Sequence, residues 1–224
     1  IWEMPYRPTP LQFECDGKKY FNERPVSTQQ SGFVYVSQMR SWLPREIGGV
    51  LWFGNDDANM VAYTPVYCSA TRTPKCYNTP GADAVTFSME NAFWVCNWVS
   101  NMVYPRYSQM FPSLELVRDS LDNSYLSQQA LVEEKAKQLD GAEAAKYLND
   151  YSCQKCEEMI ARWRQLATYL IVKYNDMVVK KENADGSFML SKHGIGERPV
   201  RPGYPNKYAK ELIKQTGTKF EVVK

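Results

Sequence analysis

The sequence predicts an α+β fold in which strands come first and helices follow. β-Branched and aromatic residues predominate between positions 26 and 67, whereas apolar residues at spacings of three and four predominate between 88 and 177. A hydrophobic content of 44% with 13% aromatic residues is typical of a folded chain and excludes disorder for most of it. We therefore expect a mixed domain over residues 1–178 and a basic tail over 179–224.

The strands are predicted from the first third of the chain. Residues 1–25 are expected to form an extended lead-in, because Pro5, Pro8 and Pro10 exclude a regular helix. Residues 26–39 carry large side chains at odd and even positions, which predicts a strand covered on both faces. A turn over 43–49 leads into strands over 50–54 and 60–67, and the polar segment 55–59 between them predicts a hairpin tip.

Three helices are predicted from the next hundred residues. Ser88 can cap the first, which ends at Pro105. Two long helices are expected over about 113–139 and 142–177, and the short Asp140-Gly141 break between them predicts an antiparallel pair. The glycine-rich stretch 183–205 is expected to be a loop, followed by a short helix near 207–214.

Charge and hydropathy exclude several classes of function. The formal net charge of +2 gives no support for nucleic-acid binding, although residues 180–224 are basic overall. No apolar stretch approaches the roughly 20 residues that a spanning helix needs, so no membrane span is expected.

Cysteine and histidine usage limits the chemistry. Cys153 and Cys156 share a helical face, which suits a metal or a redox pair but more often indicates two residues in a core. Cys68 and Cys76 flank a short loop, and the sequence leaves open whether they form a disulfide. The single histidine, His193, argues against histidine-rich zinc sites and against Cys-His or Ser-His catalysis. No motif for a nucleotide or a metal is present, so neither a cofactor nor a metal is expected.

Two polar clusters interrupt the apolar strands and are the candidate substrate-binding residues. Hydroxyl and amide groups at a strand end can hydrogen-bond a peptide, and an arginine can hold a carboxylate. Carboxylates at a hairpin tip can capture an ammonium group. The alternatives, a solvated strand end and a simple turn, remain open on sequence grounds. The candidates are Arg24, Ser27, Thr28, Gln29, Asn55 and Asp56.

Several segments resemble a known family. They are ERPVSTQQSGF at 23–33, VSQMR at 36–40, LP at 43–44, IGGVLWFGNDDA at 47–58 and YTPVY at 63–67, with weaker similarity at 93–95 and 163–174. Together they are similar to the bacterial cysteine dipeptidases of the N-terminal-nucleophile hydrolases, which include dipeptidase A and the secernins. The resemblance covers roughly residues 20–178.

The resemblance implies a fold and a mechanism. The fold is an αββα sandwich, in which two sheets face each other between helices. The nucleophile is a cysteine exposed as the first residue by removal of a leader, and its own α-amino group, with a pKa of roughly 7.7–8.0, accepts the thiol proton. The substrate is a dipeptide or short peptide, which is cleaved through a thioester.

The sequence departs from that family at its start. Residue 1 is Ile, and the surroundings of Cys15 do not resemble the family's nucleophile block. We therefore expect the C-terminal portion of a longer dipeptidase, with no catalytic residue of its own, inactive alone and partnered by the missing N-terminal portion. The alternative is a non-catalytic binding or dimerisation module that forms a homo-oligomer through an uncovered sheet face, with Val34 and Val50 as positions expected on that face.

Overall fold

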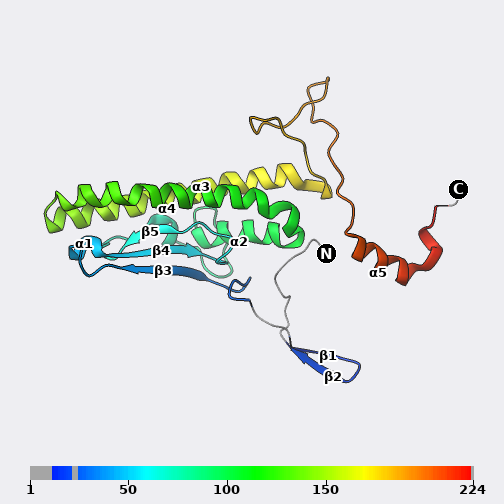
Figure 1. The fold of residues 1–224 in the computed structure, drawn as a ribbon, viewed down its shortest axis with the longest axis horizontal. Coiled ribbons are helices and arrows are strands. Elements are labelled where there is room, and N and C mark those ends of the chain that lie inside the picture. Colours follow the sequence, from blue (N-terminus) through cyan, green and yellow to red (C-terminus); the bar gives the residue numbers. More distant parts are fainter. Residues whose placement is uncertain (1–11, 22–24, 223–224) are drawn as a thin grey trace.

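The computed structural model describes residues 12–21 and 25–222 of the chain and has an α+β fold. A sheet of three antiparallel strands lies against a layer of helices, and Figure 1 shows the two longest helices side by side. The strands are β3 (Phe33–Met39), β4 (Gly49–Asn55) and β5 (Thr64–Tyr67), and the helices of this layer are α2 (Ala92–Val103), α3 (Tyr107–Lys137) and α4 (Gly141–Tyr174). The predicted order of strands followed by helices is confirmed.

The sheet has the strand order β3-β4-β5, and both pairings are antiparallel. Burial alternates along β4, so that Val50 and Trp52 face the helices while Leu51 and Phe53 face away from them. The sequence placed the first strand at 26–39 and the third at 60–67, but both begin later, at Phe33 and Thr64. Part of the predicted turn at 43–49 forms a single helical turn, α1 (Arg45–Gly48).

The outer face of β3 corrects one expectation from the sequence. Phe33, Tyr35 and Met39 are 61%, 54% and 60% exposed, so the strand is not covered on both sides. No second sheet lies over this face among the residues that the structure describes. The expectation that Val34 and Val50 lie on the open face is wrong. Val34 packs against the core, and Val50 is fully buried beneath the helices.

The starts of the helices are set by capping side chains and by a short 3-10 turn. Asn91, not Ser88, caps α2, because its side chain accepts a hydrogen bond from the Trp94 backbone N–H. Pro105 lies in a short 3-10 turn, Tyr104–Arg106, which separates α2 from α3. α3 begins at Tyr107, six residues before the predicted start, and carries Pro112 inside its second turn. Asp140 caps α4, and α3 and α4 form the predicted antiparallel pair.

The core lies between the sheet and the helix pair. α4 supplies much of it, since its apolar residues recur every three or four positions and meet both β5 and α3. The largest fully buried side chains there include Trp163, Tyr125, Leu114, Leu148 and Leu170. This packing buries one face of the sheet beneath the helices.

The two ends of the described chain extend away from this core (Figure 1). Part of the predicted lead-in forms a hairpin of β1 (Gln12–Cys15) and β2 (Lys18–Phe21), because Asp16 and Gly17 both adopt the positive φ that a tight hairpin turn needs. The last helix, α5 (Asn206–Thr216), includes the predicted helix near 207–214 and has no buried residue. Short 3-10 turns occur at Lys75–Tyr77, Asn175–Met177 and Gly217–Phe220.

Two further questions raised by the sequence concern cysteines and membranes. All six cysteines are free thiols in the structure, including Cys68 and Cys76. Among residues 12–21 and 25–222, no helix is both long enough and apolar enough to cross a bilayer.

Candidate functional site

The two polar clusters singled out in the sequence lie side by side at one end of the sheet. The backbone N–H of Asp56 donates to the carbonyl oxygen of Gly32 at 3.0 Å. The Ser27 hydroxyl donates to Asp57 Oδ1 and accepts from the Asn59 backbone N–H at 3.0 Å. The segment before β3 therefore packs on the β4–β5 connection, and five of the six candidate residues come from these two neighbouring segments.

Asp57 holds this end of the sheet together. It is fully buried, and besides Ser27 it accepts hydrogen bonds from the Asn59 N–H at 3.0 Å and the Tyr104 hydroxyl at 2.9 Å. The sequence left open whether the carboxylates at the hairpin tip bind a ligand or only form a turn, and Asp57 is an internal acceptor for donors from three segments. Its role is to position its neighbours.

Asp56 is fully buried beside Asp57 and adopts a φ of 78°. Its Oδ1 accepts from Asn97 Nδ2 at 2.8 Å. Burial raises the pKa of the Asp56 carboxyl group, whereas the nearby Ser100 and Asn97 side chains act to lower it. A carboxyl group in this setting can act as an acceptor for a cationic or N–H group that reaches it.

Two of the candidate residues, Gln29 and Asn55, have buried side-chain oxygens without a hydrogen-bond donor among the described residues. The Asp56 carboxylate differs, because the Ser100 hydroxyl lies beside it as a donor. Buried polar atoms are nearly always paired, so the two unpaired acceptors in adjacent segments are unusual. This end of the sheet is therefore rich in acceptors and suited to a ligand that presents N–H donors.

The remaining candidates have simpler surroundings. Thr28 donates its hydroxyl to Gln30 Oε1 at 2.5 Å, within a turn that is closed by the Ser31 N–H and the Thr28 carbonyl. Arg24, the predicted carboxylate-binding residue, lies outside the residues that the structure describes.

Sequence reasoning missed the contribution of α2 to this end of the sheet. Asn97 and Ser100 lie three positions apart on one face of the helix, facing Asp56, and Tyr104 follows one turn later against Asp57. The signal was present in the sequence, because a polar residue every three or four positions interrupts an otherwise apolar helix.

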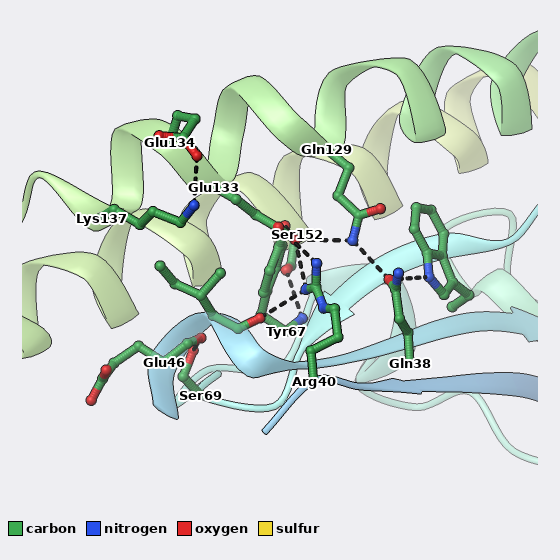
Figure 2. A network of polar contacts seen from close by, with 12 residues as sticks. Gln38, Arg40, Glu46, Tyr67, Ser69, Gln129, Glu133, Glu134, Lys137 and Ser152 are labelled. Atoms are coloured by element: carbon green, nitrogen blue, oxygen red, sulfur yellow. Dashed lines mark hydrogen bonds and ion pairs between the residues drawn. The ribbon is translucent and has the colours of Figure 1, made fainter. Parts of the chain in front are cut away.

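A buried polar network anchors the opposite end of the sheet (Figure 2). Arg40, which follows β3, donates two hydrogen bonds of 2.7 Å to the carboxylate of Glu133 on α3. The Tyr67 hydroxyl donates to the same carboxylate at 3.0 Å, and Gln129 donates to it at 2.9 Å. Burial and the nearby Glu133 charge raise the Tyr67 pKa, so this hydroxyl remains a donor. The network fixes both β3 and β5 to the helix layer.

The buried cysteines have the properties of structural residues. Burial raises the pKa of Cys76 and Cys96, and it raises that of Cys156 to about 11. Such thiols stay protonated at neutral pH and are poor nucleophiles. Within the described ranges no group of three or more histidine, cysteine or acidic side chains is arranged to hold a metal ion.

The chain also matches a known protein family. A family model described as peptidase family C69 matches residues 5–119. The matched region is just over half of the chain and contains the sheet, the two polar clusters and α2. No curated protein matches the chain significantly.

Proposed function

Because the chain belongs to peptidase family C69, we propose that it is a portion of a cysteine dipeptidase, in which it helps to bind short peptides for cleavage by a cysteine outside this sequence. Family membership itself gives a peptidase function and a peptide substrate. The dipeptide preference, the missing nucleophile and the N-terminal portion as partner are the proposal.

The observation that carries the proposal is the pair of unpaired acceptors at Gln29 and Asn55, with the Asp56 carboxylate next to Asn55 in the chain. A short peptide presents an ammonium group at its N-terminus and an N–H at each following peptide bond. An unpaired buried acceptor costs roughly 1–3 kcal/mol, so a donor that reaches it recovers much of that cost on binding. Hydrogen bonds from an ammonium group are stronger still.

The burial of three of the six thiols supports a nucleophile outside this sequence. Cys76, Cys96 and Cys156 are buried with raised pKa values, and Cys15 lies on the exposed β1–β2 hairpin. In the proposed mechanism a separate N-terminal cysteine transfers its thiol proton to its own α-amino group and attacks the peptide carbonyl. The leaving amine takes up that proton, and water then hydrolyses the thioester.

The open face of the sheet supports a missing partner segment. Phe33 stacks with Tyr35 and with Phe53 on this face, with ring centroids 6.4 and 6.0 Å apart. Aromatic surface of this kind is usually buried against another layer. We propose that the N-terminal portion of the same protein covers it and completes the sandwich formed by residues 1–178, with 179–224 as a tail.

The test compares this chain with the longer protein that contains it. We expect the purified chain to release no amino acids from dipeptides, whereas the longer protein does so. In the longer protein, Asn55→Ala is expected to lower kcat/KM at least about tenfold, because a ligand N–H loses its acceptor, with little change in Tm. Asn123→Ala, which removes an exposed asparagine from α3, is the control.

Two results would contradict this proposal. Thiol-dependent turnover by the chain alone, abolished by Cys15→Ala, would show that the nucleophile is present here. A large loss of Tm with unchanged kcat/KM would make Asn55 a structural turn residue.

A second candidate function is a dimerisation module, and the exposed aromatic residues of β3 are the observation that favours it. In that case a second copy of the chain, in place of the N-terminal portion, covers the face that contains Tyr35.

A further inference from the structure

A groove separate from the peptide site lies between the helix-facing side of the sheet and α3. Its volume is about 450 Å³, which is within the range of small-molecule sites. Its walls are mainly apolar, with Val36 and Trp52 from the sheet, Tyr63 from the segment before β5 and Leu126 from α3. The polar groups in the lining include Gln38 and Asp122.

Asp122 is a carboxylate without a cation in this groove. Its Oδ1 accepts the Tyr63 backbone N–H at 2.8 Å, but Oδ2 receives no hydrogen bond from any described residue. The cation that acts on its carboxylate from nearby, Arg118, is hydrogen-bonded to Glu115, Asp119 and the Asn59 carbonyl instead. Asp122 accordingly takes part in none of the ion pairs formed by the described residues.

The groove is also held in one shape. Gln38 Oε1 accepts from the Trp52 indole N–H at 3.2 Å and from Gln129 Nε2 at 2.7 Å. Figure 2 shows the contact between Gln129 on α3 and Gln38 on the sheet. The indole wall is therefore fixed before any ligand arrives, which lowers the entropic cost of binding.

We propose that this groove binds a small organic cation, namely a protonated amine that carries a short apolar or aromatic group. The ammonium group pairs with Asp122 Oδ2, and the apolar group lies between Trp52 and Leu126. The ammonium group gives the Asp122 carboxylate an ion-pair partner, which Arg118 does not provide. An ammonium group that lies beside the Trp52 indole face also gains a cation–π attraction. This site is independent of the proposed peptidase function, because it uses none of the residues at the hairpin tip.

The electrostatics of the groove set the pH range in which it binds. Burial raises the pKa of Asp122 to about 6, with a smaller contribution from Asp119, while the Tyr63 N–H and Arg118 act to lower it. Tyr63, which faces Asp122 from the sheet side, stays neutral because burial and the Asp122 charge raise its pKa. Asp122 is thus ionised at pH 8 and protonated at pH 5, whereas an alkylammonium with a pKa of about 10.4, as in lysine, keeps its charge at both.

The test is calorimetric titration of the full chain with phenethylamine, and with 2-phenylethanol as the uncharged analogue of similar size. At pH 8 we expect the amine to bind at least tenfold more tightly than the alcohol. The amine should lose about that factor at pH 5, whereas the alcohol should not change. Equal affinities, or no binding of the amine at pH 8, would overturn the proposal.

Matched variants locate the site. Asp122→Asn keeps an acceptor for the Tyr63 N–H and is expected to weaken amine binding about tenfold, whereas Asp119→Asn should change it less than twofold. Leu126→Lys places an ammonium one helical turn from Asp122 and should abolish binding, while Leu131→Lys, at an exposed position outside the groove, should not. Unchanged affinity in Asp122→Asn, with circular dichroism showing a folded chain, would contradict the assignment.

Discussion

Glu133 on α3 joins three parts of the molecule through one carboxylate. It accepts hydrogen bonds from Arg40 after β3, from Tyr67 on β5 and from Gln129 one turn earlier on its own helix. The Arg40 and Glu133 side chains are 12% and 9% exposed, so this is a nearly buried ion pair. Removing one partner of such a pair leaves an uncompensated charge, which costs more than the pair contributes in net stability.

The neighbouring residue provides a matched comparison. Glu133→Ala is expected to lower the free energy of unfolding by roughly 3–5 kcal/mol, because Arg40 is left buried without its partner. Glu134→Ala breaks only the exposed pair with Lys137 and should cost about 1 kcal/mol or less. Urea denaturation followed by circular dichroism measures both. Similar small losses in the two variants would show that Arg40 reaches solvent when Glu133 is absent.

At the scale of elements, α3 and α4 are joined by a sharp reversal of the chain. α3 ends at Lys137 and α4 begins at Gly141, with Asp140 between them as the N-terminal cap of α4. The Asp140 side chain accepts the Glu143 backbone N–H at 2.8 Å, which satisfies one of the free donors at the helix start. The sequence predicted this boundary closely because a capping residue and a glycine coincide there.

Two substitutions of the capping residue Asp140 distinguish the contribution of its hydrogen bond to stability from that of its charge. Asp140→Ala is expected to destabilise the chain by about 1 kcal/mol, whereas Asp140→Asn, which keeps an acceptor, should cost only a few tenths. Thermal unfolding of both variants beside the original chain measures the difference. If Asn proves as costly as Ala, the charge at the helix start would be the larger contribution.

At the scale of the whole molecule, the sheet has one covered face and one open face. Val50 and Trp52 pack beneath the helices, whereas Phe33, Tyr35 and Met39 remain exposed. This asymmetry follows from the order of the elements, since α2, α3 and α4 all pack on the same side. Either a further segment of the protein or a second copy of the chain can cover the open face.

Self-association tests the second possibility. If copies of the chain pair through the open face, light scattering should show a molar mass that rises with concentration toward that of a dimer. Tyr35→Glu should return it to a monomer, because a charge on this face disfavours apolar contact. Leu131→Glu changes an exposed apolar residue on α3 and should leave the association intact. A molar mass that stays monomeric at every concentration would remove this candidate function.

The sequence predicted what depends on local patterns and missed what depends on distant contacts. The spacing of apolar residues placed β4, α2 and α4 well, and the resemblance to dipeptidases directed attention to Asn55 and Asp56. Periodicity could not show that β3 lies at an edge with one face open, because its large side chains alternate as they would in a covered strand. The burial of Asp56 and Asp57 could not be predicted from the sequence either, because it depends on how α2 packs against the hairpin.

The exposed edge of β3 has a consequence for how this protein must be handled. Residues Phe33–Met39 contain no charged residue and no proline, and β4 pairs with only one side of the strand. Natural sheets normally protect such edges with lysine, proline or a covering segment, because an uncharged edge recruits further strands into fibrils. The unpaired side of β3 is therefore the part of the sheet at which we expect aggregation to start when nothing covers it.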